Sequence, residues 1–403
     1  MSVKSRALET PRELLRAEES VTPAREIEAL VRRFELARRP SVRRLVYSSS
    51  RVADLAAVFP GAIYAMASRR GPATRRRRAL DLVERGAALK DVAQALDLPL
   101  WLRRLPPEAF AGSIGPLPAT EMFARRIVNY LPASAAESAF WLRSVIFAAQ
   151  ACDEYFALWL AAQPVFSEAG EPERLFGLLA AYAWYSSADL SRAQGLIGVP
   201  WRPEMAFDTA VCATKSWLNR LRLVLQLRNG AIADAWLETG EARGLTFVPL
   251  VDQREILAEA HAMQNCADQY ADRLVRDRCR LFSIRRRGVR VATLEIGPHP
   301  REAGVLAISQ LKARHNMPAA TEVWQAAHAW LGSQKDLRRP SALAAPERPL
   351  CAETWESLMD PYRVRKRGAP WIPQSPSKAA FSVLESDIAD LARRGGITSW
   401  LFT

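Results

Sequence analysis

Six polar side chains between residues 261 and 316 have the types and spacing of a chemical site. They supply a thiol, a phenol, a guanidinium, a carboxylate and two amides, from Cys266, Tyr270, Arg285, Glu295, Gln310 and Asn316. Such a set can position a phosphate or an acyl group, with Arg285 holding the anion and Glu295 acting as a base or an orienting group. The same groups can instead satisfy one another in a polar network that fixes how a helix lies on a sheet. The residues alone leave both interpretations open.

Hydrophobic periodicity predicts the elements that carry these groups. Apolar residues recur at helical intervals over residues 254–274, and one edge of the expected helix carries Glu259, Met263, Cys266 and Tyr270. Three antiparallel strands are predicted after this helix, at residues 281–285, 289–296 and 305–311. The first two strands form a hairpin through Arg286, Arg287 and Gly288.

Alternation along the second predicted strand separates two faces. One face carries Arg290, Ala292, Leu294 and Ile296, and the other carries Val289, Val291, Thr293 and Glu295. A carboxylate in the middle of an apolar strand costs several kcal/mol when it is buried without a partner. Glu295 therefore needs a cation, a hydrogen-bond donor or water. Arg285 and Gln310 are the predicted partners.

This stretch resembles the PcfJ-like domain, a poorly characterised bacterial family associated with plasmids and other mobile elements. The family pattern is a Met-x-His-Cys-Val-x-x-Tyr helix, an isoleucine-rich strand ending in Arg, a Thr-Leu-Glu strand and a Gln-x-x-Gly-x-x-Asn turn. The resemblance covers about residues 245–335. The matching residues are Met263, Cys266, Tyr270, Ser283, Arg285, Thr293, Glu295, Gln310 and Asn316.

Three departures from the family pattern change what the resemblance implies. Asn265 stands where the family has His, Ala267 stands for Val, and Ala313 stands for Gly. Because Asn265 cannot act as a base, a His–Cys catalytic pair is not carried over to this chain. His261 could replace the missing base only if the start of the helix is irregular. The expectation for function therefore moves from Cys266 towards Arg285 and Glu295.

The net charge of the chain favours an anionic partner. It is +13, and residues 1–110 alone hold 22 Lys and Arg against 13 Asp and Glu. Two basic groups are predicted to contact the phosphates of DNA or RNA without reading sequence: Arg75, Arg76, Arg77 and Arg78, and Arg286, Arg287 and Arg290. The alternative is that these arginines form solvated surfaces and reflect composition. Other proteins of a mobile element are a second class of expected partner.

Residues 79–105 have the outline of a helix-turn-helix, but the second half does not suit base reading. Trp101, Leu102 and Leu105 are apolar, and only Arg103 and Arg104 could reach base edges. A buried helical hairpin is therefore favoured over a DNA-reading motif. Aromatic residues at helical spacing between 140 and 185 are predicted to be core.

Composition bounds the remaining possibilities. The 403 residues are 49% apolar, and no stretch has the length and low charge of a membrane span. The N-terminus lacks the apolar region of a secretory signal, which favours the cytoplasm. Five cysteines without a Cys-x-x-Cys pair and four scattered histidines argue against a disulfide framework or a zinc site, so no cofactor or metal is expected.

The sequence therefore predicts an α+β protein in four segments. These are a basic helical region (1–110), an aromatic-rich helical region (119–245), the PcfJ-like α+β domain (246–335) and a Pro-rich basic tail with a docking helix (336–403). The expected function is association with nucleic acid. The alternatives are a hydrolase or transferase that uses Cys266, Arg285 and Glu295, and a helical protein-interaction scaffold.

Overall fold

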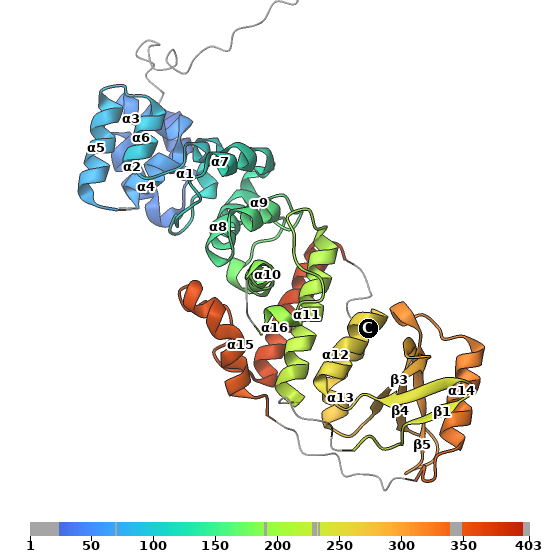
Figure 1. Cartoon of the computed structure of the whole chain (residues 1–403). Helices are drawn as coiled ribbons and strands as arrows, with labels where there is room; N and C mark the ends of the chain where they lie inside the picture. Colours follow the sequence, from blue (N-terminus) through green and yellow to red (C-terminus); the bar gives the residue numbers. More distant parts are fainter. Residues whose placement is uncertain are drawn as a thin grey trace, which may run out of the picture. The chain divides into compact units, whose positions relative to one another are not determined.

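Helices and one antiparallel sheet make up the described part of the chain (Figure 1). The computed structural model describes residues 24–68, 71–188, 192–227, 232, 234–338 and 349–397, so parts of the first, second and fourth predicted segments lie outside it. The α+β class is confirmed. The chain divides into two compact units, Met1–Ala180 with Asp390–Thr398, and Ala181–Ala389 with Ser399–Thr403.

The first unit contains a helix, α4 (Pro60–Ala67), whose residues are all buried. The hydroxyl of Tyr64 on α4 lies within hydrogen-bond distance of two acceptors, Glu35 Oε2 (2.9 Å) and the carbonyl oxygen of Gly112 (2.6 Å). Burial, together with the hydrogen bond to Glu35, raises the pKa of Tyr64 to about 12. The other elements of this part are α1 (Ala24–Arg32), η1 (Leu36–Arg38), α2 (Arg39–Val46), α3 (Ser50–Val58), α5 (Ala73–Glu84), α6 (Leu89–Ala95), η2 (Leu100–Arg104) and η3 (Pro107–Ala109).

The segment with the helix-turn-helix outline does not form a DNA-reading motif. After α6, Asp97 adopts a positive φ of 56°, and the chain continues as the short 3-10 helix η2. Trp101 and Leu102 on η2 are buried, as the favoured interpretation predicted. A recognition helix needs exposed polar residues over several turns, so this element cannot enter a major groove.

Most aromatic residues of the next helices are buried, as expected, but the prediction is wrong for Tyr155. Phe140, Trp141 and Phe156 are each at most 2% exposed, although Tyr155 is 49% exposed. Three of these helices have an N-cap residue whose side-chain oxygen accepts a hydrogen bond from a backbone N–H group. The elements are α7 (Glu121–Ile127), η4 (Val128–Tyr130), α8 (Ala135–Ala151), α9 (Glu154–Ala161) and α10 (Pro172–Ser187).

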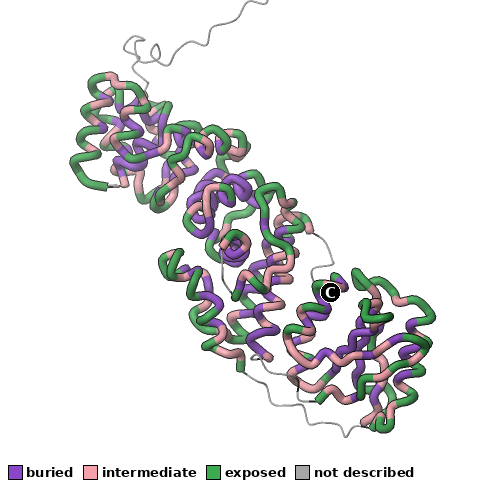
Figure 2. Tube along the Cα trace, in the orientation of Figure 1, coloured by how far each residue is buried: buried purple, intermediate pink, exposed green. Residues whose placement is uncertain are grey.

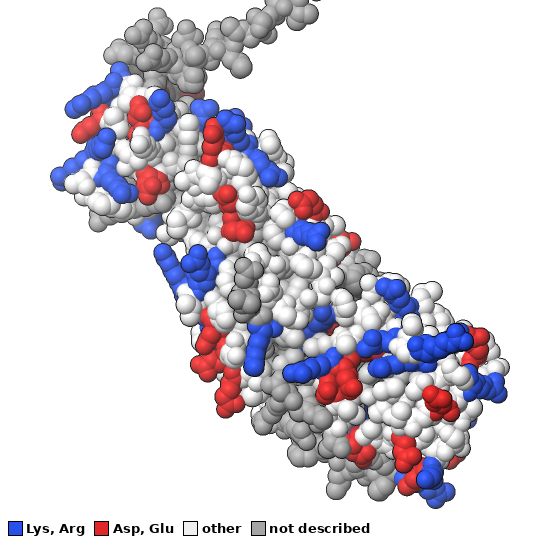
Figure 3. All heavy atoms as spheres, in the orientation of Figure 1, with Lys and Arg blue, Asp and Glu red and all other residues white. Residues whose placement is uncertain are grey.

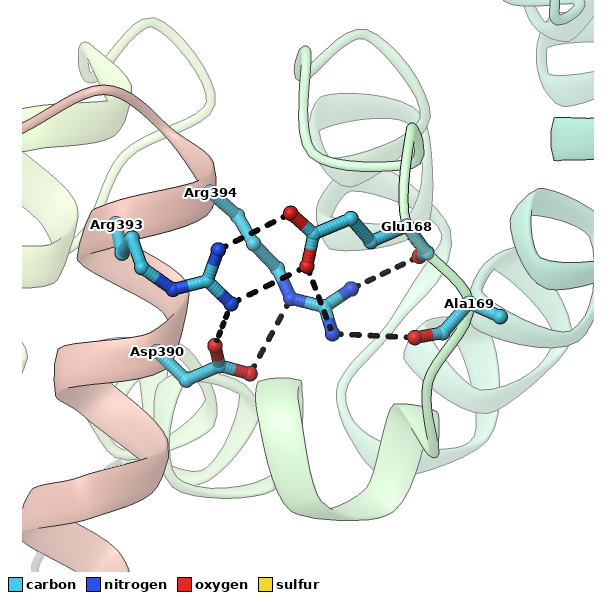
Figure 4. Close-up of polar contacts among 5 residues, drawn as sticks. All are labelled: Glu168, Ala169, Asp390, Arg393 and Arg394. Atoms are coloured by element: carbon cyan, nitrogen blue, oxygen red, sulfur yellow. Dashed lines mark hydrogen bonds and ion pairs between the residues drawn. The ribbon is translucent and has the colours of Figure 1, made fainter.

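An ion cluster joins the end of the last helix, α16 (Lys378–Arg394), to the connection between α9 and α10 (Figure 4). Arg393 donates to both carboxylate oxygens of Glu168, at 3.0 and 3.2 Å, and also contacts Asp390. Arg394 donates to the backbone carbonyl oxygens of Glu168 (2.9 Å) and Ala169 (3.1 Å). These contacts hold the end of α16 to the first unit, which includes Asp390, Arg393 and Arg394.

Helices of the second unit pack through buried aromatic rings. The Tyr185 hydroxyl donates to the carbonyl oxygen of Leu358 (2.7 Å), and its ring lies 5.5 Å from that of Trp217 and 5.9 Å from that of Tyr362. The helical elements outside the sheet region are η5 (Gln194–Leu196), α11 (Phe207–Leu227) and α15 (Ala352–Arg365), with the first part of α16.

The sheet of the second unit has five strands rather than the predicted three. All neighbours are antiparallel, in the order β1-β2-β3-β4-β5. The predicted strands correspond to β3, β4 and β5, and two short strands before the predicted helix were missed. The strands are β1 (Gly240–Ala242), β2 (Leu245–Pro249), β3 (Arg280–Arg286), β4 (Val289–Pro298) and β5 (Leu306–Lys312).

One face of the sheet is apolar and is covered by α14 (Thr321–Gly332). Trp330 of α14 is fully buried and stacks on Phe247 of β2, with ring centroids 4.6 Å apart and planes at 3°. Its indole also lies against Gly240, where an added Cβ would be 3.0 Å from the ring. Figure 2 shows buried residues in the central strands.

The opposite face is covered by α12 (Gln253–Met263), η6 (Ala267–Gln269) and α13 (Ala271–Val275), which lie between β2 and β3 in the sequence (Figure 1). The prediction of one helix over residues 254–274 is wrong. Helix α12 ends at Gln264, which adopts the left-handed conformation (φ 49°, ψ 49°). Cys266 and Tyr270 therefore lie beyond the helix that carries Glu259 and Met263. Within the described residues, no helix combines the length and the apolar character needed to cross a membrane.

Candidate functional site

Polar side chains line the sheet face that α12 and α13 cover. Glu295 on β4 is opposite Gln310 on β5, and Thr293 is opposite Ser283 on β3. Glu259, Ser283 and Glu295 are at most 2% exposed. We call this set the polar layer: Glu259, Asn265, Tyr270, Arg273, Ser283, Arg290, Thr293, Glu295 and Gln310.

A bulge in β4 brings Arg290 into the polar layer. Arg285 pairs with Arg290, whereas the preceding residue, Ile284, pairs with Ala292, so Val291 is the extra residue. The prediction that Arg290 shares a face with Ala292 is therefore wrong. Regular alternation would place Arg290 on the α14 side, but the bulge places its guanidinium against Glu259 of α12.

Glu259 is the first centre of the polar layer, and its side chain has no exposed surface. Arg290 Nε donates to its Oε2 at 2.8 Å, and the Thr293 hydroxyl donates to its Oε1 at 2.7 Å. Asn265 Nδ2 in turn donates to Thr293 Oγ1 at 2.7 Å. The Asn265 side-chain oxygen accepts the backbone N–H of Ala267 at 3.1 Å, which holds the chain where it leaves α12.

Glu295 is the second centre, and it is 2% exposed. One carboxylate oxygen accepts a hydrogen bond from the Tyr270 hydroxyl at 3.0 Å, and the other forms an ion pair with Arg273. The guanidinium of Arg273 also lies 5.2 Å from the centre of the Tyr270 ring. Gln310 contacts the same hydroxyl at 3.3 Å, so it reaches Glu295 only through Tyr270.

The cation that pairs with Glu295 is Arg273, not the predicted Arg285. Arg285 lies further along the same face of the sheet, and its Nε donates to Ser283 Oγ at 3.2 Å. Sequence reasoning missed Arg273 because it considered partners for Glu295 only on the neighbouring strands. The three-residue step from Tyr270 to Arg273 is the signal that places both side chains on one side of a helical turn.

Cys266 lies at the margin of this network, next to an exposed amide. Its Sγ is 3.6 Å from Asn316 Oδ1. Burial raises the pKa of the Cys266 thiol, and the nearby charges of Asp268 and Glu295 act in the same direction. Burial and the charge of Glu295 likewise raise the pKa of the Tyr270 phenol. Both groups therefore stay protonated at neutral pH and act as hydrogen-bond donors.

The structure thus brings together five of the six predicted site residues and separates the sixth. Cys266 with Asn316, and Tyr270 with Glu295 and Gln310, form adjoining contacts, while Arg285 lies apart with Ser283. Sequence reasoning also missed the central position of Glu259. The buried carboxylates already have donors for both oxygens, which is the arrangement of a polar network. Among the described residues, no group of three or more His, Cys, Asp and Glu side chains could hold a metal ion.

The predicted phosphate-contacting arginines occupy α5 and the β3–β4 hairpin. On α5, Arg75 pairs with Asp97 at 3.4 Å, and Arg76 donates to the carbonyl oxygen of Gly71 at 2.6 Å. Arg286 pairs with Glu322 of α14 at 2.7 Å, and Arg290 pairs with Glu259. The other three, Arg77, Arg78 and Arg287, are exposed, and no carboxylate of the described residues contacts them.

Comparison with known proteins gives no match: no protein-family model, no curated protein and no solved structure matches this chain.

The polar layer predicts that the Thr293 hydroxyl stabilises the second unit. Thr293→Val keeps the shape of the side chain but removes a donor from Glu259 and an acceptor from Asn265. We expect it to lower the free energy of unfolding by about 1–3 kcal/mol, because a buried carboxylate oxygen loses its partner. Hydrogen exchange of the β3 and β4 amides measures this change. Thr246→Val, at a half-buried position whose hydroxyl reaches Glu241 at 3.3 Å, is the matched control and should cost less than about 0.5 kcal/mol. Equal effects of the two substitutions would contradict the assignment.

The raised pKa of Cys266 predicts slow alkylation at neutral pH. Because the thiolate is the reactive form, iodoacetamide should label Cys266 more slowly at pH 7.5 in the folded chain than in the urea-unfolded chain. The folded-state rate should rise about tenfold per pH unit until the raised pKa is reached. Mass spectrometry of the peptide that contains Cys266, with Cys266→Ser as the blank, gives both rates. Faster labelling in the folded chain would show an activated thiol instead.

Proposed function

We propose that this chain is a PcfJ-like protein of a mobile-element context that associates with nucleic acid through sequence-independent contacts to phosphates. The resemblance over residues 245–335 supplies the family and its context, which remain predictions. The observation that carries the nucleic-acid part is the group of exposed arginines without acidic partners: Arg77 and Arg78 on α5, and Arg287 in the β3–β4 turn.

Unpartnered arginines suit phosphate binding better than paired ones. An arginine that already contacts a carboxylate must give up that interaction before it binds a phosphate, whereas Arg77 and Arg78 lose only water. Figure 3 shows further Lys and Arg side chains over the part of the second unit that contains the sheet. The net charge of +13 adds a long-range attraction that does not depend on base sequence.

An enzyme built on Cys266, Arg285 and Glu295 has weaker support. Glu295 is buried, and its oxygens are taken by Tyr270 and Arg273, so it is poorly placed to accept a proton from a substrate. The thiol pKa is raised rather than lowered, which is the opposite of what a nucleophilic cysteine needs. Arg285 is outside this cluster.

The proposal predicts oligonucleotide binding that weakens steeply with salt. We expect the dissociation constant for a fluorescein-labelled 20-nucleotide strand to rise about tenfold or more between 50 and 200 mM NaCl, as three or more phosphate contacts require. Fluorescence anisotropy with DNA and RNA of two unrelated sequences measures it, and sequence should matter little. An affinity that is the same at both salt concentrations, or no binding at either, would rule the proposal out.

A pair of charge-matched variants tests where the contacts lie. Arg77→Gln with Arg78→Gln removes two unpartnered cations. Arg43→Gln with Arg125→Gln removes two exposed cations that pair with Glu28 and Glu121. Both variants lose the same net charge, but only the first loses arginines without acidic partners. It should therefore weaken binding several-fold more than the second. Equal losses would show that only overall charge matters.

A further inference from the structure

Two arginines lie directly opposite each other at the end of the polar layer. The register pairs Arg285 of β3 with Arg290 of β4, and both side chains lie on the sheet face that α12 covers. Like charges at opposed positions of neighbouring strands destabilise a sheet unless an anion compensates them. Within the described residues, Glu259 is the carboxylate that contacts this pair, and it contacts only Arg290. One positive charge therefore remains uncompensated.

The uncompensated group is Arg285, and its guanidinium is held in a defined orientation. Its side chain is half-buried, and its Nε donates to the buried Ser283 hydroxyl at 3.2 Å. In the described part of the chain, no protein acceptor contacts its two terminal NH2 groups. A guanidinium fixed through Nε presents those two groups side by side, which is the geometry that binds two oxygens of a phosphate.

The other charged groups near Arg285 do not occupy this position. Glu241 reaches only the hydroxyl of Thr246, which lies opposite Arg285 on β2. On the α14 side of the sheet, Arg243 of the β1–β2 turn donates to Gln325, and Arg286 pairs with Glu322. Arg243 and Arg286 are therefore partnered. Arg285 differs from them because it lies on the α12 side and its terminal NH2 groups contact no acceptor of the described residues.

We infer that Arg285, with Arg290 beside it, forms a phosphate-binding site at the α12 side of the β3–β4 hairpin. This inference rests on the proposed association with nucleic acid, and it names the residue that would hold one phosphate of the ligand. Arg285 supplies the two-donor contact, and Arg290 lies opposite it with its Nε on Glu259. Exposed Arg287 lies in the adjoining β3–β4 turn.

Titrations of the full-length chain with two probes test the site and distinguish the source of the phosphate. Inorganic pyrophosphate, followed by 31P NMR line broadening, represents a free phosphate. A 12-nucleotide DNA strand without a terminal phosphate, followed by anisotropy, represents the backbone diester. Arg285→Gln is compared with Arg243→Gln, which removes the same charge from the same end of the sheet but on the α14 side. Arg285→Lys keeps the charge without the paired donors and serves if the Gln variant does not fold.

Selective loss is the expected result. Arg285→Gln should weaken binding of at least one probe by about tenfold, and Arg285→Lys by less, while Arg243→Gln should change either probe by less than about twofold. Selective loss for the DNA strand assigns the site to backbone phosphates. Selective loss for pyrophosphate in a chain that does not bind DNA supports the site and rejects the proposed function. If the unsubstituted chain binds DNA but Arg285→Gln and Arg243→Gln lose equal affinity, the site is overturned and the proposed function stands. Absence of binding to both probes rejects both.

Discussion

Two carboxylates buried on one face of a sheet set the conditions that the second unit must meet. A buried carboxylate is stable only when charged or polar donors replace the water it has lost. Glu259 meets this condition through Arg290 and Thr293 of β4, which ties α12 to that strand. Glu295 meets it through Tyr270 and Arg273, which ties the chain around α13 to the same strand. Strand β4 is therefore the common support of both helices.

The register of β4 follows from the same condition. A slip by one residue would turn Thr293 and Glu295 towards the α14 side, where Trp330 stacks on Phe247 within a cluster of buried apolar side chains. The bulge at Val291 then reverses the alternation for the strand's first residues. It gives Glu259 its cation, and it places that cation opposite Arg285. A stabilising contact and a candidate anion site thus share one backbone irregularity.

Sequence patterns were sufficient to predict the secondary-structure elements whose local signal is strong. Alternation and the Arg-Arg-Gly turn identified β3, β4 and β5, and the isolated acid in β4 correctly called for a partner. These patterns were insufficient for elements whose formation depends on tertiary contacts. Strand β1 has three residues, and β2 ends in Pro249 and is separated from its neighbour β3 by α12 and α13. The end of α12 depends on a left-handed Gln264, a residue type that carries no signal for that conformation.

The side chains that pair with one another within the site could not be predicted from the sequence either. Arg285 was a predicted partner for Glu295, yet Arg273 reaches it from a short helix whose start no periodicity predicts. The convergence of Cys266, Tyr270, Gln310 and Asn316 near Glu295 was predicted, because the resemblance grouped these residues. Their chemistry was not, because burial rather than residue type sets the pKa of a thiol and a phenol.

A double-mutant cycle between Glu259 and Arg290 tests most directly whether these contacts hold the second unit together. Glu259→Gln, Arg290→Met and the double variant are compared by the free energy of unfolding from hydrogen exchange of the β4 amides. If the buried ion pair joins α12 to the sheet, the sum of the two single losses in unfolding free energy should exceed the loss in the double variant by about 1–3 kcal/mol. Losses that add to within about 0.5 kcal/mol would show that the two side chains act independently and would contradict this account.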